Sequence, residues 1–256
     1  MVSADITPPQ MDYYQDLNQN QRFDADEPWD DRNGNGVFDP IYLAGFSQNR
    51  MATGVNDPLL LQAASFSQNQ LRVVLVSMDS IGWFKHHTDE VLKNLQKRFK
   101  VDALLVHATH NHEAPDTIGL WGPDFFHTGV PTSYIDFVKK QMERAVQKAL
   151  EQEQEASLSH GLLNEVPDSL GVVDSRPYPK LLDKRLLVAQ FHSLKSKKIL
   201  GTIVNFANHV ETLWSGNLKI TADFPGFFKR SSGKGGGPGK PMVGEPHPSA
   251  GDVFSW

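Results

Sequence analysis

Two histidines follow a short apolar run in this chain. Leu104-Leu105-Val106 predicts a buried strand whose C-terminal end leads to His110 and His112. Side chains two residues apart share one face of an extended segment. His110 and His112 can therefore point into one cleft, while Asn111 faces away.

A third histidine can join them from elsewhere in the chain. A second apolar run, residues 199–206, ends just before His209, and the ends of neighbouring strands are where open α/β sheets bind ligands. Neutral imidazole is a common zinc ligand, and catalytic zinc needs about three protein ligands plus an open position. We therefore expect a metal or catalytic site at His110, His112 and His209. Four other histidines, taken one at a time, are expected to be structural: His107, His127, His160 and His192.

Two charged residues outside the histidine blocks also have the right type for a site. Asp79 ends a predicted strand at 72–79, where it can orient a ligand histidine, bind metal itself or cap a turn. Arg176 stands in a Pro-bounded loop, where it can hold a substrate oxygen or carboxylate or remain a solvated charge.

Residues 16–39 contain two copies of one pattern of oxygen-bearing side chains. These side chains stand at positions 1, 3, 5 and 9 of each copy, as in loops that wrap calcium, and Gly36 stands at position 6 of the second copy. Ordinary turns also use Asn and Asp, but the repeat, with phenylalanine at the same offset, favours structural calcium. The bidentate Glu of an EF-hand is not found at position 12, since Ile41-Tyr42-Leu43 follows, so we do not predict an EF-hand. The expected calcium ligands are Asp16, Asn18, Asn20 and Asp24, then Asp31, Asn33, Asn35 and Asp39.

The composition fits one large domain or part of a bigger one. The chain has 256 residues, of which 39% are hydrophobic, and a formal net charge of -5, which gives no electrostatic reason to expect nucleic acid. Cysteine is absent, which excludes disulfides and thiolate ligands. No apolar run approaches the roughly 20 residues of a membrane span, and the sequence opens without a signal-peptide core.

The order of the elements predicts an α/β fold with a mixed β-sheet and flanking helices. A strand at 72–79, a helix from about Thr88 to Lys100 and a strand at 102–108 form a β-α-β unit with parallel strands. The remaining expected elements are a long core-packing helix from Pro131 to about Gln154 and strands at 156–164, 185–193 and 198–206, the last two paired as a hairpin.

The character of the chain changes after Arg230. Residues 231–256 are rich in Gly and Pro and have no periodicity, so we expect a disordered tail. Gly239-Lys240 does not form a phosphate loop, because Pro241 replaces the required Ser or Thr and Lys234 stands where the first glycine should be.

Several blocks together resemble the neutral/alkaline non-lysosomal ceramidase family, especially its bacterial members. The resemblance implies that residues 1–230 are part of a catalytic domain, with residues 16–39 as a calcium-binding insertion and 231–256 as a disordered or aberrant tail. The blocks occur in the family's order and spacing: Ala4-Asp5-Ile6-Thr7-Pro8-Pro9, Ala44-Gly45-Phe46, Gly54-Val55-Asn56-Asp57-Pro58-Leu59, Ala108-Thr109-His110-Asn111-His112 and Ala222-Asp223-Phe224-Pro225-Gly226.

The resemblance implies zinc-dependent hydrolysis of an N-acyl amide such as ceramide. His110 and His209 would be zinc ligands, His112 would assist proton transfer or substrate binding, and Arg176 would lie near the substrate. Zinc in such a site activates water and stabilises the oxyanion. Family members are generally exported, which implies a periplasmic or extracellular location and access to lipid substrates at a membrane surface.

The sequence departs from the family at both histidine blocks. The family has Thr-His-Thr-His-Ser-Gly-Pro, whereas this chain has Asn111 and Glu113, and Glu211 lies two residues after His209, where the family has Pro-Thr. Glu113 and Glu211 add two carboxylates to the expected cleft and can alter substrate preference. The metallo-β-lactamase pattern His-x-His-x-Asp-His fails, because Ala114 and Pro115 occupy its last two positions.

The family's remaining zinc ligands, a glutamate and a tyrosine, come from beyond the last residue of this sequence. Two readings therefore stay open: part of a zinc amidohydrolase, or a non-catalytic, calcium-stabilised binding module. We also hypothesise that a frameshift or a wrongly assigned terminus explains the change of character after Arg230.

Overall fold

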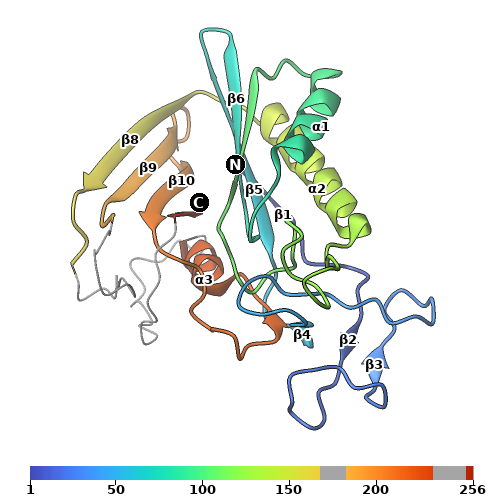
Figure 1. Ribbon diagram of the computed structural model, residues 1–256. Helices are drawn as coiled ribbons and strands as arrows, with labels where there is room; N and C mark the ends of the chain where they lie inside the picture. Colours follow the sequence, from blue (N-terminus) through green and yellow to red (C-terminus); the bar gives the residue numbers. More distant parts are fainter. Residues whose placement is uncertain (168–182, 233–251, 256) are drawn as a thin grey trace.

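The computed structural model describes residues 1–167, 183–232 and 252–255, and Figure 1 shows two sheets flanked by helices. The first sheet has the strand order β1-β5-β6-β7. β6 pairs antiparallel with β5 and parallel with β7, so the carboxyl ends of β6 and β7 lie at the same edge. The strands are β1 (Val2–Asp5), β5 (Leu60–Gln68), β6 (Leu71–Met78) and β7 (Ala103–Ala108).

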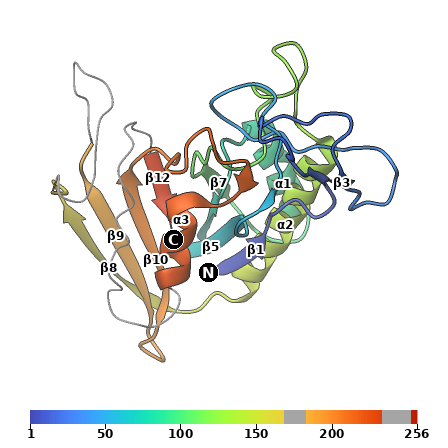
Figure 2. The same cartoon turned by 90° about the horizontal axis from the view of Figure 1, so that it is seen from below.

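The second sheet is antiparallel, with the order β12-β10-β9-β8. It lies on one side of the first sheet, and helices α1 and α2 cover the opposite side, which gives three layers (Figures 1 and 2). The elements are β8 (Ala156–Leu163), β9 (Leu186–Ser193), β10 (Ile199–Ala207), β12 (Asp252–Ser255), α1 (Lys85–Gln96), α2 (Thr132–Glu151) and α3 (Asp223–Ser232).

The main core lies between the first sheet and its two helices. Alternate residues of β6, Val74, Val76 and Met78, are almost fully buried because a strand turns successive side chains to opposite faces. In α2 the buried positions recur every three or four residues, as a helix with one core-facing side requires. They are Tyr134, Ile135, Val138, Met142, Ala145, Val146, Ala149 and Leu150.

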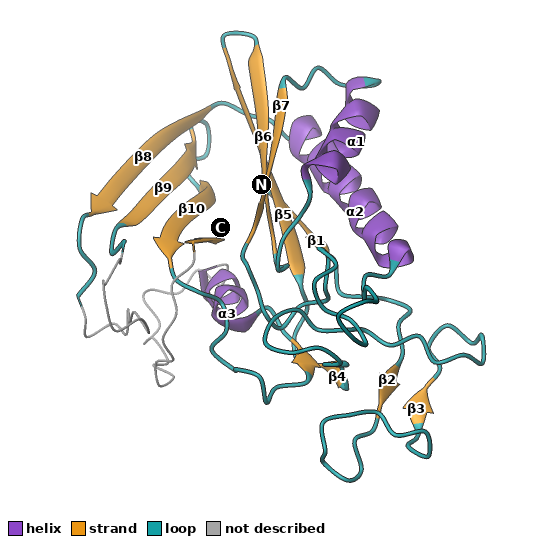
Figure 3. Cartoon of the chain, viewed as in Figure 1, coloured by secondary structure: helices purple, strands orange, loops and turns teal. Residues whose placement is uncertain are grey.

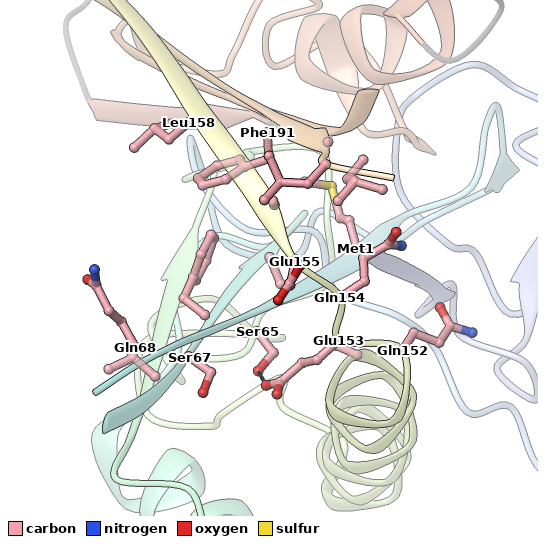
Figure 4. Close-up of a pocket in the computed structure, with 18 of the residues that line it drawn as sticks. Met1, Ser65, Ser67, Gln68, Gln152, Glu153, Gln154, Glu155, Leu158 and Phe191 are labelled. Atoms are coloured by element: carbon pink, nitrogen blue, oxygen red, sulfur yellow. Dashed lines mark hydrogen bonds between the residues drawn. The ribbon is translucent and has the colours of Figure 1, made fainter. Parts of the chain in front are cut away.

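The two sheets pack less tightly against each other. The rings of Phe66 in β5 and Phe191 in β9 are in contact, with centroids 5.0 Å apart. Beside them a cavity of about 970 Å³ opens between the sheets, and Figure 4 shows Met1, Phe191 and Glu153 among the side chains that line it. β8, at the edge of its sheet, is exposed along its whole length. The second sheet is therefore the less firmly held layer.

Four short strands organise the loops, which Figure 3 draws at the end of the first sheet below its helices. β2 (Tyr13–Tyr14) pairs with β3 (Trp29–Asp30), and β4 (Gly54–Val55) pairs in parallel with β11 (Lys219–Ile220). Within the described residues, no helix is long and apolar enough to cross a bilayer.

The expected α/β class, the parallel β-α-β unit and the β9–β10 hairpin are confirmed. α1 begins at Lys85, one turn before the expected Thr88, and ends at Gln96. The arrangement of strands differs from expectation, because β10 is not a neighbour of β7 but belongs to the other sheet.

Two short pieces of the expected tail have secondary structure. α3 extends to Ser232, and Asp252–Ser255 form β12. Residues 233–251 and 256, which make up most of that segment, lie outside the described residues.

Candidate metal centre

His110 and His112 follow the end of β7, where main-chain hydrogen bonds fix the chain against the segment after β6. The amide of Thr109 donates to the Met78 carbonyl at 2.9 Å, and the amide of Asn111 donates to the Ser80 carbonyl at 3.0 Å. His110 has a φ of 61°, in the left-handed region, so this segment is not a regular strand. The two histidines meet through this turn and not through the alternation of an extended strand.

His209 reaches the same place from the other sheet. It follows the end of β10, and there Asn111 and Val210 form a parallel bridge. The amide of His112 donates to the Val210 carbonyl at 3.0 Å. The side-chain amide of Asn111 is buried and donates to the Thr221 carbonyl at 2.7 Å, which fastens a third segment to the junction. The site therefore forms where the two sheets meet.

The three imidazoles converge as the sequence predicted. One nitrogen from each of His110, His112 and His209 lies within 4.8 Å of the other two, a group that can hold a metal ion. The Nε2 atoms of His112 and His209 are 2.7 Å apart. The Nδ1 atom of His110 lies 2.9 Å from the Ile81 carbonyl, which makes Nδ1 the donor and leaves Nε2 with a free lone pair.

The electrostatic environment keeps His112 neutral. Burial, followed by the proximity of His209, His110 and Arg50, lowers the pKa of His112 to about 3. Its Nδ1 atom is buried and has no hydrogen-bond partner in the described part of the chain. Neutral imidazoles with available lone pairs are the form that binds a divalent transition metal.

The spacing of the nitrogens also fits a metal ion. Two nitrogens bound tetrahedrally at about 2.0–2.1 Å from zinc lie roughly 3.3 Å apart. The Nε2 atoms of His112 and His209, at 2.7 Å, would need to separate only slightly. A hydrogen bond between them requires one of the two Nε2 atoms to carry a proton.

Small and aromatic residues shape the wall behind His112. Gly45 has a φ of +79°, and a Cβ at this position would collide with Nδ1 of His112. Phe46 packs against His112 with ring centroids 5.2 Å apart and against Trp214 at 5.0 Å. Trp121 lies 6.5 Å from His112 on another side. The wall behind His112 is thus largely apolar.

Glu211 lies close to the imidazoles. One carboxylate oxygen of Glu211 is 3.7 Å from Nδ1 of His112 and 3.7 Å from Nε2 of His209, and the residue is 6% exposed. Asp79, in contrast, contacts Lys229 of α3 at 2.6 Å and the Leu60 amide at 2.9 Å. The carbonyl of Ile81, and not Asp79, contacts His110.

Glu113 belongs to a buried ion pair beside the site. Its carboxylate accepts hydrogen bonds from Arg50 at 2.6 Å and from the side chain of Asn217 at 2.8 Å. Burial raises the pKa of Glu113 to about 7 and lowers that of Arg50, although their mutual attraction opposes both shifts. The sequence analysis did not identify Arg50, since one arginine in a loop carries no motif.

The other predicted site residues lie elsewhere. Arg176 falls outside the described residues. His107, His127, His160 and His192 do not belong to a group of metal-binding geometry in the described part of the chain. His127 is exposed, and its ring contacts Asp124 at 2.8 Å.

The two loops of residues 16–39 have matching geometry. In the first loop Asp16 accepts the Asn20 amide at 3.1 Å, and in the second Asp31 accepts the Asn35 amide at 3.2 Å. The side-chain amides at positions 3 and 5 converge on the aspartate at position 9, Asp24 or Asp39, at 2.7–2.8 Å. The rings at position 8 of the two loops, Phe23 and Phe38, are 4.3 Å apart.

The sequence analysis missed one acidic residue of each loop. Glu27 stands at position 12 of the first loop, and its oxygens accept the amides of Leu17 and Asp24, at positions 2 and 9. In the second loop Asp12, which precedes both loops, accepts the amides at the same two positions, from Arg32 and Asp39. The spacing from Asp16 could have revealed Glu27, but no spacing within the second loop points back to Asp12.

Comparison with known proteins gives matches in structure alone. No protein-family model matches the sequence, and no curated protein matches it. A solved ceramidase complexed with C2 has a TM-score of 0.64 at 18% identity, covering 89% of this chain and 33% of its own. The neutral ceramidase from Pseudomonas aeruginosa has a TM-score of 0.64 at 16% identity, covering 92% of this chain and 36% of its own.

The fold is that of a neutral ceramidase. The family resemblance inferred from the sequence blocks is thus supported by the arrangement of the backbone. The chain spans about a third of the length of these two ceramidases. The three histidines lie within this shared ceramidase fold.

The depressed pKa of His112 predicts how the stability of the metal-free protein depends on pH. The pKa is about 3 in the folded protein and about 6.5 when unfolded, so the unfolded chain binds the proton more tightly. Stability from this residue is present above pH 6.5 and is lost as the pH falls toward 3. We expect the free energy of unfolding, measured by urea denaturation, to fall less between pH 7.5 and pH 5 in His112→Gln than in the wild type.

A measurement at pH 7.5 and pH 8.5 is the control, because His112 is neutral in both states there. The difference in the free energy of unfolding between the wild type and His112→Gln should stay constant over that interval. An equal loss of stability in both proteins between pH 7.5 and pH 5 would show that His112 is not held neutral by the fold.

Proposed function

We propose that this chain is part of a zinc-dependent hydrolase of N-acyl amides. The observation that carries the proposal is the convergence of three imidazoles, within 4.8 Å of one another, in a fold shared with neutral ceramidases. Zinc would supply Lewis acidity toward a water molecule and toward an amide carbonyl. A lipid amide of the ceramide class is the proposed substrate.

The residues have distinct proposed roles. His110 and His209 would hold the zinc ion, and the carbonyl of Ile81 would keep Nε2 of His110 available as a ligand. His112 would contact the substrate or move a proton at its unpartnered Nδ1 atom. Glu211, with an oxygen 3.7 Å from two of the imidazoles, would accept a proton or select the substrate. Arg176 remains a proposed substrate-binding residue.

The alternative is a non-catalytic, calcium-stabilised binding module. The observation that favours it is the matching geometry of the two loops in residues 16–39, where side-chain amides converge on Asp24 and Asp39 at 2.7–2.8 Å. Zinc content and turnover distinguish the two functions.

The zinc proposal predicts one zinc ion per chain after purification in the presence of calcium, measured by elemental analysis. His110→Ala and His209→Ala should each lose it, because each removes one of the two proposed zinc-ligating imidazoles. The zinc-loaded protein should release fatty acid from at least one member of a panel of N-acyl lipids and N-acyl amino acids. Both substitutions should abolish this release.

The matched control is His160→Ala, which removes an exposed histidine from β8 and should retain zinc and turnover. Zinc at one ion per chain without any turnover across the panel would favour the binding module. Absence of zinc from the wild-type protein would contradict the hydrolase.

We also propose that residues 16–39 bind two structural calcium ions. Each loop offers three carboxylates, from Asp16, Asp24 and Glu27 in the first and from Asp12, Asp31 and Asp39 in the second. Glu27 and Asp12 occupy equivalent places, since each accepts the amides of positions 2 and 9 of its loop. Rotation of the amides at positions 3 and 5 would turn their oxygens toward an ion.

The calcium proposal predicts two binding events in calorimetry and a calcium-dependent rise in melting temperature. Glu27→Gln should weaken the site of the first loop, and Asp12→Asn that of the second, each on the order of tenfold or more because a charged ligand is lost. Asp26→Asn is the control, since it removes an exposed carboxylate of the same segment. If Asp26→Asn weakens calcium binding as much as Glu27→Gln, general charge and not a built site is responsible.

The two proposed calcium loops also support the proposal that the protein is exported, because calcium is millimolar outside cells. Export remains a proposal that rests on the ceramidase fold and on these loops together.

We further propose that the lipid substrate is taken from a membrane surface. Phe125 and Phe126 are 86% and 93% exposed. Asp124 holds their turn in shape by accepting the amides of Phe126 and His127. The same loop carries Trp121, which faces His112. A preformed apolar tip on the loop that carries Trp121 fits insertion into lipid.

This proposal predicts that the double variant Phe125→Ser, Phe126→Ser loses binding to phosphatidylcholine vesicles in a sedimentation assay. Turnover of substrate embedded in vesicles should fall in proportion, while turnover of a soluble short-chain substrate should stay unchanged. Leu71→Ser, an exposed apolar residue of β6, is the control. Equal losses on both substrates would contradict a role limited to the membrane surface.

A further inference from the structure

We propose that Arg50 is the positioning residue that holds His112 in place beside His209 at the proposed zinc site. The inference rests on the proposed zinc site, but neither the sequence motifs nor the ceramidase likeness assigns a role to Arg50. It is a loop residue that is 4% exposed, and its guanidinium makes its hydrogen bonds beside the histidine cluster.

The guanidinium of Arg50 joins four groups from separate parts of the chain. Nη1 donates to the carbonyl of Ala44 at 2.8 Å and to the carbonyl of His112 at 3.0 Å. Nη2 donates to the carboxylate of Glu113 at 2.6 Å and to the carbonyl of Asn217 at 2.9 Å. These acceptors come from the segment before Arg50, the turn after β7 and the segment before β11. One side chain therefore ties the backbone of His112 to two other segments.

Arg50 also supports the imidazole of His112 from its far side. The guanidinium lies 4.9 Å from the ring centroid of Phe46, and the Phe46 ring in turn packs against the imidazole of His112 at 5.2 Å. The bond to Ala44 fixes the residue before Gly45, and the backbone of Gly45 lies directly against Nδ1 of His112. Both the main chain and the ring of His112 are thus held by groups that contact Arg50.

Lysine cannot make the same set of contacts. The planar guanidinium presents donors in a fixed fork, whereas an ammonium is a point charge on a flexible stem. Four acceptors in three segments require the several donors that a guanidinium holds in a fixed arrangement. The partner Glu113 compensates the buried charge, and it is fixed in turn by the side chain of Asn217 at 2.8 Å.

The test compares zinc affinity in variants of the whole chain. Arg50→Met combined with Glu113→Gln removes both charges together, so no unpaired charge stays buried. We expect the zinc dissociation constant, measured by competition with a chelating dye, to rise 10- to 100-fold, as for groups that orient metal ligands. The absorption spectrum of the cobalt-substituted protein should change as well, because the ligand geometry changes.

The matched control is Arg72→Met with Glu153→Gln, a pair of the same residue types at the opposite end of β6, joined at 2.8 Å. It should alter zinc affinity less than twofold. Zinc affinity within twofold of wild type in the Arg50 double variant would overturn the proposal.

A second variant covers the case in which the double variant does not fold. Arg50→Lys keeps the positive charge next to Glu113, and we expect it to unfold near the wild-type temperature but to lose at least fivefold in zinc affinity. Wild-type affinity in this variant would overturn the proposal.

A zinc-free measurement separates this inference from the proposed function. If the wild-type protein binds no zinc, the hydrolase proposal fails. The imidazole nitrogen signals of His112 in NMR then test Arg50. They should shift or broaden in Arg50→Lys as contact with His209 is lost, and unchanged signals would count against a positioning role.

Discussion

The hydrogen bond from the His112 amide to the Val210 carbonyl, at 3.0 Å, joins two sheets that share no strand. β7 brings His110 and His112 from the first sheet, and β10 brings His209 from the second. The first sheet is anchored by the packed core under α1 and α2, whereas the second stands beside an open cavity. The geometry of the imidazoles therefore depends on this junction more than on the packing of either sheet.

The ionisable side chains around the junction are buried, and burying their charged forms costs solvation free energy. Burial lowers the pKa of His112 and of Arg50 and raises that of Glu113, so in each case the neutral form is favoured. A buried ion pair adds little net stability, because desolvation offsets the attraction between its members. The ion pair of Arg50 and Glu113 is better understood through the geometry that it imposes on three segments than through the stability that it adds.

The sequence predicted the parts of the fold that depend on local periodicity. The strand and helix patterns of residues 72–154 follow from burial on one face, which repeats every two residues in strands and every three or four in helices. The pairing of β10 could not be predicted, because alternation along a strand does not identify its neighbour. Two separate sheets arose where one was expected.

The candidate site was predicted in its ligands but not in its supports. The types and spacing of His110, His112 and His209 identify them, although the left-handed backbone at His110 has no sequence signal in a histidine. Arg50 could not be recognised, since its four acceptors are mostly backbone carbonyls, which every residue has. Glu27 stands at position 12 counted from Asp16, which is the position of the bidentate Glu in an EF-hand. The sequence analysis compared only the second loop with that pattern and so did not identify Glu27.

Gly45 gives the site a feature that can be followed through evolution. Its positive φ and the contact of its backbone with His112 leave no room for any side chain. A descendant that had lost the imidazole at position 112 would no longer be under selection to keep glycine there. The identity of this one residue could therefore help to separate, among genome sequences of the same fold, lineages that retain the three-histidine cluster from those that have lost it.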